Sequence, residues 1–308
     1  MRNDDNFLKI LGDFRIVPTG NSVVADIFED EFDITWHRSH KSNNPEQRVW
    51  GLIEKENAED DGTVSYKYNN EYFRSDEFVS THKGRHVLFA GCSETEGQGG
   101  DLEDAWGKIL FNNISDQHSL DGYYSVGKSG YGWQKIINQV RTYIKKYGKP
   151  DNLFILLPNI GRFLEWSDEL SDWYARQEYP NLWPDQPAAF ESNMYIGEQT
   201  PERYKKAFVD FVSTWKLFED FCIEANIKLV WGSWYAVDSY NFNNLNLFKN
   251  FVFLFQSDML DNIDQYRKDA KLLPNDMNKR DGHHGRLYHE YWADKMLKEA
   301  RAKGFLDD

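Results

Sequence analysis

Short apolar runs, separated by amphipathic stretches, constrain the fold of this chain more than any other feature of its sequence. The runs are Val87 to Ala90, Tyr123 to Val126, Leu153 to Leu157, Ile227 to Trp231 and Phe251 to Phe255. Continuous apolar runs of this length are typical of parallel strands that are covered on both faces. The chain therefore predicts a buried parallel sheet of about five strands.

Amphipathic stretches between and after these runs predict the helices that cover the sheet. Apolar residues recur every three to four positions from Trp133 until Gly148 stops the pattern. A second such stretch begins at Pro201 and continues to Cys222, and a third ends at Gly304. Strands that alternate with helices predict a three-layer α/β/α fold, similar to that of flavodoxin.

The chain divides into two parts by its pattern. Residues 1–84 carry mixed polar and aromatic sequence with weak alternation, as at Val64 to Tyr68, and predict a β-rich extension. Residues 85–308 carry the regular α/β pattern. Residues 163–200 within them interrupt it, and we interpret them as an irregular, aromatic-rich insertion that includes Trp166, Trp173 and Trp183.

Charge and composition limit the classes of partner. The net charge of −14 repels phosphate backbones and anionic membranes, and no basic patch offsets it, so neither is expected as a partner. The sequence lacks a basic, apolar secretory signal, and Cys92 and Cys222 suit a reduced compartment. Cytoplasmic synthesis is expected. A virion-associated protein or a component of a larger assembly would have the same features.

Two separated stretches carry the residues of acyl-transfer chemistry. In HVLFAGCSETEG, Ser93 follows the first predicted strand, and in RDGHHG, Asp281 and His284 precede the last helix. A hydroxyl, an imidazole and a carboxylate together form a serine nucleophile with its base. Gly130 and Asn159 also follow predicted strands, and the carboxyl ends of parallel strands share one edge of a sheet. We expect these residues to gather there.

Each residue also has a plain structural interpretation. Ser93 and Glu96 have capping-box spacing, Gly130 could relieve a turn, and Asn159 could be a turn residue. GYYSVGKS, with Lys128, formally fits a phosphate-binding loop. A true loop of that kind begins after its strand and opens a helix at its serine, whereas here the intervening residues form the predicted strand.

A metal centre is a further alternative, because three histidines cluster near the C-terminus. These are His283, His284 and His289. Their spacing matches no strong ligand pattern, and the two cysteines are far apart in sequence. We therefore expect neither a metal nor a cofactor, and we interpret His289 as a surface or packing residue.

Taken in order, these blocks resemble the SGNH hydrolases, the superfamily of GDSL-type lipases and esterases. The resemblance extends over residues 66–304. It rests on GCSETEG, VGKSGYG, LLPNI and DGHH, preceded by YNNEYFRSDEF, which is similar to the N-x-x-G-F-R stretch of many members. The chain departs from the family pattern at Cys92, where an aspartate is usual, and at Leu157 and Ile160, which replace a glycine and an aspartate around Asn159.

The resemblance implies a role for each matched residue. Ser93 would attack an ester, His284 would be the base, with His283 as its competitor, and Asp281 would orient the imidazole. The amides of Ser93 and Gly130 and the side chain of Asn159 would form the oxyanion hole. The implied function is that of a serine esterase, plausibly removing O-acetyl groups from a carbohydrate held by the tryptophans of the insertion. The alternative is a non-catalytic glycan-binding or structural component, such as part of a viral tail.

Overall fold

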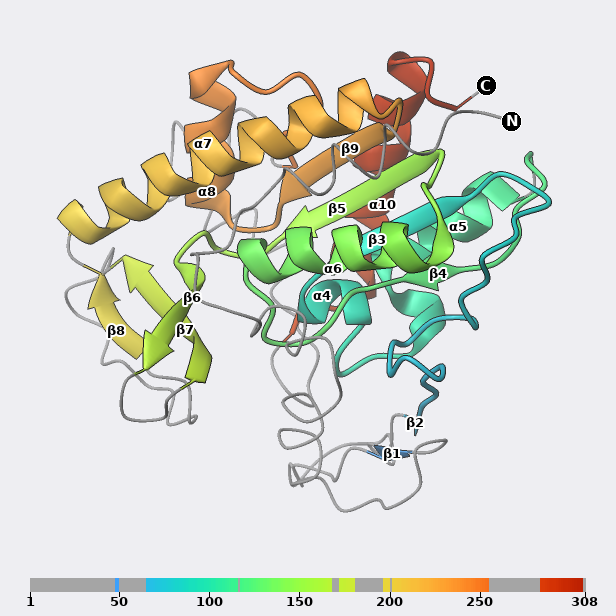
Figure 1. Cartoon of the computed structure of the whole chain (residues 1–308), viewed down its shortest axis with the longest axis horizontal. Helices are drawn as coiled ribbons and strands as arrows, with labels where there is room; N and C mark the ends of the chain where they lie inside the picture. The colour runs from blue at the N-terminus through green and yellow to red at the C-terminus, as the bar shows by residue number, and fades with distance from the viewer. Residues whose placement is uncertain are drawn as a thin grey trace.

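The computed structural model describes residues 48–49, 65–115, 117–167, 172–180, 196–199, 201–254 and 283–306. Its centre is a parallel sheet of four strands in the order β4-β3-β5-β9 (Figure 1). The strands are β3 (Val87–Gly91), β4 (Tyr124–Ser125), β5 (Asn152–Leu157) and β9 (Lys228–Ser233). The predicted α/β class is confirmed, and each of the first four predicted apolar runs overlaps one of these strands.

Successive residues of the strands contribute to two separate cores, one on each face of the sheet. Leu88 and Ala90 pack with the residues of α6 (Trp133–Tyr147) and α7 (Pro201–Glu224). Phe89 lies between them in sequence and packs instead against α5 (Trp106–Ser115) and α10 (Arg286–Ala302). Figure 1 shows the first pair of helices in front of the sheet and the second pair behind it. The alternation therefore produces the expected three layers.

Two helices lie where the sequence pattern predicted none. These are α5 and α8 (Ala236–Leu245). The predicted fifth strand is wrong in extent, because Phe251 forms only an isolated parallel bridge with Trp231. Residues 252–254 continue without strand structure, and Phe255 lies outside the described residues.

The insertion, where it is described, consists of strands and not of the irregular structure that the sequence suggested. It contains the hairpin β6 (Arg162–Ser167) and β7 (Asp172–Pro180), to which β8 (Ile196–Gln199) adds in parallel. Trp166 and Trp173 are register partners in the hairpin, and Trp183 lies outside the described residues. This stretch interrupts the α/β pattern of the sequence, but its aromatic residues are also common in β-strands.

Little of the N-terminal extension falls within the described residues. β1 (Arg48–Val49) pairs antiparallel with β2 (Ser65–Tyr66), which agrees with the strand expected around Tyr66. The boundary between residues 84 and 85 stays a prediction. No helix among the described residues combines the length and the apolar character needed to cross a membrane.

Candidate active site

The first strand of the sheet delivers Ser93 to a short helical turn. β3 ends at Gly91, and α4 (Ser93–Glu96) begins two residues later. Cys92 holds the N-cap position, so Ser93 is the first helical residue and not a cap. The capping-box interpretation of Ser93 is therefore wrong. Ser93 is 4% exposed, and its Oγ lies 3.9 Å from Cys92 Sγ.

A close approach at the end of β3 explains the glycine before this turn. A side chain at Gly91 would place its Cβ 2.0 Å from Oγ1 of Thr95, so the turn can fold back over the strand only if residue 91 is glycine. Thr95 Oγ1 also accepts a hydrogen bond of 3.2 Å from the indole nitrogen of the buried Trp106. The turn formed by α4, here called the serine turn, is thus fixed against both the sheet and α5.

The other end of α4 is held by Arg74, which comes from the stretch before the sheet. Its Nη1 donates to the carbonyl oxygens of Glu96, Gly97 and Gly100 at 3.3, 2.6 and 2.9 Å. The guanidinium carbon lies 4.4 Å from the ring centroid of Tyr66. Carbonyls that end a helix need donors, and this buried arginine supplies them.

The glycine loop after β4 lies against α4 through Glu96. This carboxylate is 2% exposed, and its Oε2 accepts the backbone N–H of Ser129 at 2.7 Å and contacts the Ser129 hydroxyl. Its Oε1 accepts the hydroxyl of Tyr68 at 3.1 Å. Gly130 follows directly with φ +81°, a conformation that side chains disfavour, and space around its α-carbon is open.

The same loop does not have the form of a phosphate-binding loop. Tyr124 and Ser125, within the matching motif, form β4 itself, and the following helix begins only at Trp133. The motif lysine, Lys128, is 3% exposed and donates to the carbonyl of Tyr72 at 2.6 Å. It is therefore part of the packing around the aromatic stretch before the sheet.

Asn159 follows β5 and is completely buried. Its Oδ1 accepts the N–H of Gly161 at 2.6 Å, which fixes the side-chain amide, while its Nδ2 has no hydrogen-bond partner within the described residues. An unsatisfied buried donor is costly unless a ligand completes it. Gly91 pairs with Leu156 in the sheet, so Ser93 and Asn159 both leave the same edge within a few residues.

Asp238 on α8 supports the turn that carries Asn159, and the sequence pattern did not identify it. Its Oδ2 accepts the N–H of Ile160 at 2.8 Å, and its side chain is buried. Ile160 stands where the resembling block has an aspartate. The carboxylate of Asp238 thus supports this turn from α8.

His284 precedes α10, and its imidazole lies against α4. Nδ1 is 2.8 Å from Oε1 of Glu94, the residue after Ser93, although the two are separated by 190 positions in sequence. Its ring centroid lies 4.6 Å from that of Tyr288 and 5.0 Å from that of Trp292. Asp281 lies outside the described residues, and no hydrogen bond joins Ser93 Oγ to His284 in the described part of the chain.

Glu94 also lies near a second histidine. Nε2 of His289 is 3.6 Å from Glu94 Oε2, and Nδ1 of the same ring accepts the backbone N–H of Trp106 at 3.1 Å. His289 is 4% exposed, so it is a packing residue and not a surface one. Burial alone would raise the pKa of Glu94, but the hydrogen bond and charge of His284, with His289 and His283, lower it below its ordinary value.

Trp234 links the two sides of this cluster. Its indole N–H donates to Cys92 Sγ at 3.5 Å, and its ring centroid lies 5.7 Å from that of His284. Cys92 Sγ is therefore a buried hydrogen-bond acceptor. The contacts of Glu94 and Trp234 hold the imidazole of His284 against α4 and the residue before it.

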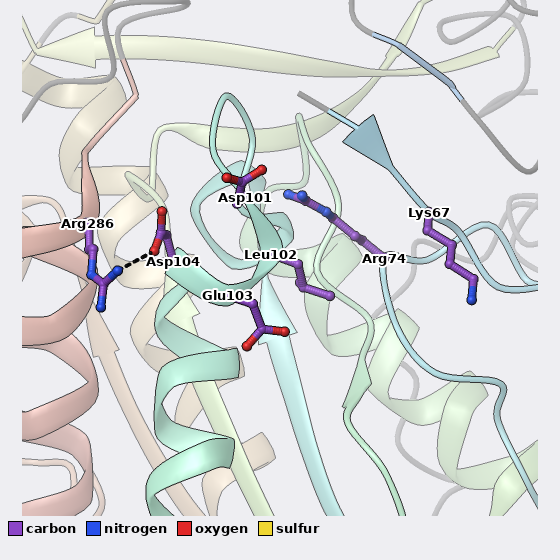
Figure 2. A pocket seen from close by; sticks show the side chains of 7 residues that line it. All are labelled: Lys67, Arg74, Asp101, Leu102, Glu103, Asp104 and Arg286. Carbon is purple, nitrogen blue, oxygen red and sulfur yellow. Dashed lines mark hydrogen bonds and ion pairs between the residues drawn. The ribbon is translucent and has the colours of Figure 1, made fainter. Parts of the chain in front are cut away.

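A pocket of about 500 Å³ lies between the short helix η1 (Leu102–Asp104) with the residue before it, Arg286 at the start of α10, and Lys67 and Arg74 from the stretch before the sheet (Figure 2). Arg286 donates to Asp104 Oδ1 at 3.1 Å across one side of it, and Asp104 belongs to η1. The lining contains both cationic and carboxylate groups: Lys67, Arg74, Asp101, Leu102, Glu103, Asp104 and Arg286. Such a surface can hydrogen-bond a hydroxyl-rich molecule as donor and as acceptor.

No group of histidine, cysteine, aspartate and glutamate side chains in the described ranges has the arrangement of a metal site.

Comparisons with known proteins give structural likenesses only. No family model and no curated protein matches the chain. An acetyl xylan esterase, Est2A, from the rumen bacterium Butyrivibrio proteoclasticus is 12% identical, over 79% of this chain and 67% of that one, with a TM-score of 0.37. The protein YXIM from Bacillus subtilis is 14% identical, over 82% and 65%, with a TM-score of 0.42.

A third solved structure is the psychrotrophic esterase EstA from Pseudoalteromonas sp., inhibited by monoethylphosphonate. It is 13% identical, over 69% of this chain and 96% of that one, with a TM-score of 0.35. The chain spans about two thirds of the length of the first two proteins. At these identities the likenesses assign no residue a role.

Proposed function

We propose that this chain is a metal-independent serine esterase of the SGNH type. The observation that carries the proposal is the contact of His284 with Glu94, because it holds an imidazole beside the turn that presents Ser93. A serine with a neighbouring imidazole is the minimal pair for nucleophilic acyl transfer at neutral pH.

In this mechanism Ser93 Oγ attacks the carbonyl carbon of an ester while His284 Nε2 accepts the hydroxyl proton. The C–O bond to the alcohol breaks as the imidazolium returns that proton to the leaving oxygen. Water then attacks the acyl-serine, again losing a proton to His284, and the acid is released with Ser93 restored. A carboxylate keeps the imidazole in the productive tautomer, a role that the resemblance assigns to Asp281.

The oxyanion that forms in each half-reaction needs donors at the edge of the sheet. The proposed donors are the backbone amides of Ser93 and Gly130 and the Nδ2 of Asn159. The support from Asn159 is specific, because its buried Nδ2 lacks an acceptor within the described residues while its Oδ1 is engaged. Preorganised donors of this kind contribute about 3 kcal/mol each to transition-state stabilisation.

We further propose a carbohydrate O-acetyl ester as the substrate class. The pocket lined by Arg74, Asp104 and Arg286 suits an alcohol with many hydroxyl groups, whereas a long acyl chain needs an apolar groove. Arg74 connects this pocket to the end of α4. Trp166, Trp173 and Trp183 stay candidates for contact with sugar rings.

Hydrolysis of p-nitrophenyl acetate by wild type and by Ser93→Ala tests the proposal. We expect the substitution to lower kcat at least about 1,000-fold, because the nucleophile is lost. Ser115→Ala is the matched control, since Ser115 is partly exposed at the end of α5 and its hydroxyl donates to the nearby carbonyl of Asn112. A phosphonate probe should label wild type at Ser93.

Equal rates for wild type and Ser93→Ala would overturn the esterase assignment and favour a non-catalytic glycan-binding or structural component. A panel of acetylated oligosaccharides and long-chain esters then tests the substrate class. Activity confined to the long-chain esters would refute the carbohydrate proposal while leaving the esterase mechanism intact.

A further inference from the structure

Glu94 is a buried carboxylate whose recorded partners are both histidines. It is 3% exposed, and within the described residues no lysine or arginine forms an ion pair with it. Oε1 lies 2.8 Å from His284 Nδ1, and Oε2 lies 3.6 Å from His289 Nε2. A buried carboxylate requires such compensation, so the two imidazoles determine whether this charge is stable.

The backbone fixes the tautomer of His289. The N–H of Trp106 donates to His289 Nδ1 at 3.1 Å, so that nitrogen carries the lone pair. In the neutral ring the proton is then on Nε2, which faces Glu94. Trp106 is completely buried at the start of α5, and its own indole is fixed by Thr95, so this donor cannot turn away.

The carboxylate of Glu94 in turn fixes the tautomer of His284. An ionised carboxylate only accepts hydrogen bonds, so at 2.8 Å His284 Nδ1 must carry the proton. Nε2 of the neutral ring then holds the lone pair that a general base needs. Edge-on contacts with Tyr288 and Trp292 of α10 restrict rotation of the ring.

We infer that Glu94 is the positioning residue that holds His284 as the base, through the contact of its Oε1 with His284 Nδ1. Its Oε2 makes no hydrogen bond within the described residues and lies 3.6 Å from His289 Nε2. This inference rests on the proposed esterase function and deepens it. Nδ1 has a single proton to donate, and Glu94 accepts it, so Asp281 is not the direct orienting carboxylate. The serine turn thereby supplies both the nucleophile and the group that orients its base.

The electrostatics of the cluster agree with an ionised Glu94. The titratable groups recorded around it are His283 and His284 before α10 and His289 within that helix. Against the effect of burial, which raises it, the hydrogen bond and charge of His284 and the charges of the other two lower the pKa of Glu94. The carboxylate is therefore charged at neutral pH and able to hold the Nδ1 proton.

The tautomers can be measured without any substrate. In protein with ¹⁵N-labelled histidine, the ring nitrogen signals at pH 7.5 report which nitrogen carries the proton, and the variants His284→Ala and His289→Ala identify each set. We expect Nδ1–H for His284 and Nε2–H for His289. In Glu94→Gln the preference of His284 for Nδ1–H should be lost. A neutral His284 in the Nε2–H form in wild type would overturn the inference.

Kinetics give the second readout. For p-nitrophenyl acetate we expect Glu94→Gln to lower kcat about 10²- to 10⁴-fold with KM changed less than threefold, as expected for an amide that allows the wrong tautomer. Glu94→Asp should recover part of kcat. Asp281→Asn should cost less than Glu94→Gln, and circular dichroism should show that the variants are folded.

The outcomes separate this inference from the proposed function. If Glu94→Gln stays within threefold of wild-type kcat while Ser93→Ala is inactive, the esterase function holds and the positioning role of Glu94 is overturned. A larger loss in Asp281→Asn than in Glu94→Gln would likewise return the role to Asp281. If Ser93→Ala matches wild type, the function itself fails, and the ¹⁵N measurement still decides the tautomers.

Discussion

The two glutamates of α4 lie two positions apart on one helical turn, yet they serve different parts of the site. Glu94 faces the imidazoles of His284 and His289. Glu96 faces the Ser129 amide and hydroxyl and the Tyr68 hydroxyl. One turn therefore holds His284 on one side and the glycine loop on the other.

This difference teaches that two buried carboxylates of similar exposure can carry separable functions. The imidazoles around Glu94 lower its pKa against the effect of burial, so Glu94 is a determinant of pH dependence. Hydroxyl and amide partners make Glu96 a determinant of structure. For the buried Tyr68 hydroxyl, burial first and then the Glu96 charge raise the pKa well above its ordinary value. The predictions below test that separation.

The largest effect is expected from Glu96→Ala. The substitution leaves the Ser129 amide and the Tyr68 hydroxyl without their acceptor, and each unsatisfied buried donor costs about 1–3 kcal/mol. The free energy of unfolding should fall by about 4 kcal/mol in urea denaturation. Glu103→Ala, at a residue whose side chain is 67% exposed, is the control and should change it by less than about 0.5 kcal/mol. A decrease in unfolding free energy for Glu96→Ala that is no larger than that of the control would contradict the structural role of Glu96.

The next effect concerns the oxyanion donor on the neighbouring strand. Asn159→Ala should lower kcat about 10²- to 10³-fold, equivalent to about 3 kcal/mol, because one donor to the oxyanion is lost. Asn159→Asp keeps an acceptor for the Gly161 amide and should lower kcat at least as far. Asn113→Ala, exposed on α5, is the control. Wild-type kcat in the Asp variant would exclude Asn159 from the oxyanion hole.

The smallest effect is the pH dependence of stability that comes from Glu94. Because its pKa in the folded protein lies below the ordinary 4.5, its ionised form favours folding. That contribution is fully present above pH 4.5 and is lost as the pH falls through the lowered pKa. The difference in unfolding free energy between wild type and Glu94→Gln should therefore shrink between pH 6 and pH 3. A difference that stays constant over this range would contradict a lowered pKa.

The sheet could be predicted because its strands are continuous apolar runs that are buried on both faces. Leu88 and Phe89 enter opposite cores, so both must be apolar, and the pattern is visible in the sequence. The helix α6 was equally visible from its 3–4 spacing. By contrast α5 escaped prediction, because Gly107 and two asparagines weaken its helical pattern and its apolar stripe is short.

The candidate site could be predicted only in part. Ser93, Gly130 and Asn159 each follow a strand, so topology alone sends them to one edge. The contact of His284 with Glu94 could not be predicted from topology, since the two residues are 190 positions apart. The same holds for Ile160 and Asp238, which are 78 positions apart. An acidic residue beside the proposed nucleophile, in a turn that continues a buried strand, was the available signal for Glu94.

Arg74 has a consequence for how the protein can be divided. The pattern of the sequence changes near residue 85, but the guanidinium of Arg74 ties together three carbonyls at the end of the serine turn. Phe73 beside it belongs to the core in front of the sheet. A shortened form that starts at residue 85 would keep every proposed catalytic side chain. It would lose Arg74, which holds the end of the turn that carries Ser93. Residues 66–78 therefore belong with the site in any modular use of this protein, such as fusion to a carbohydrate-binding domain.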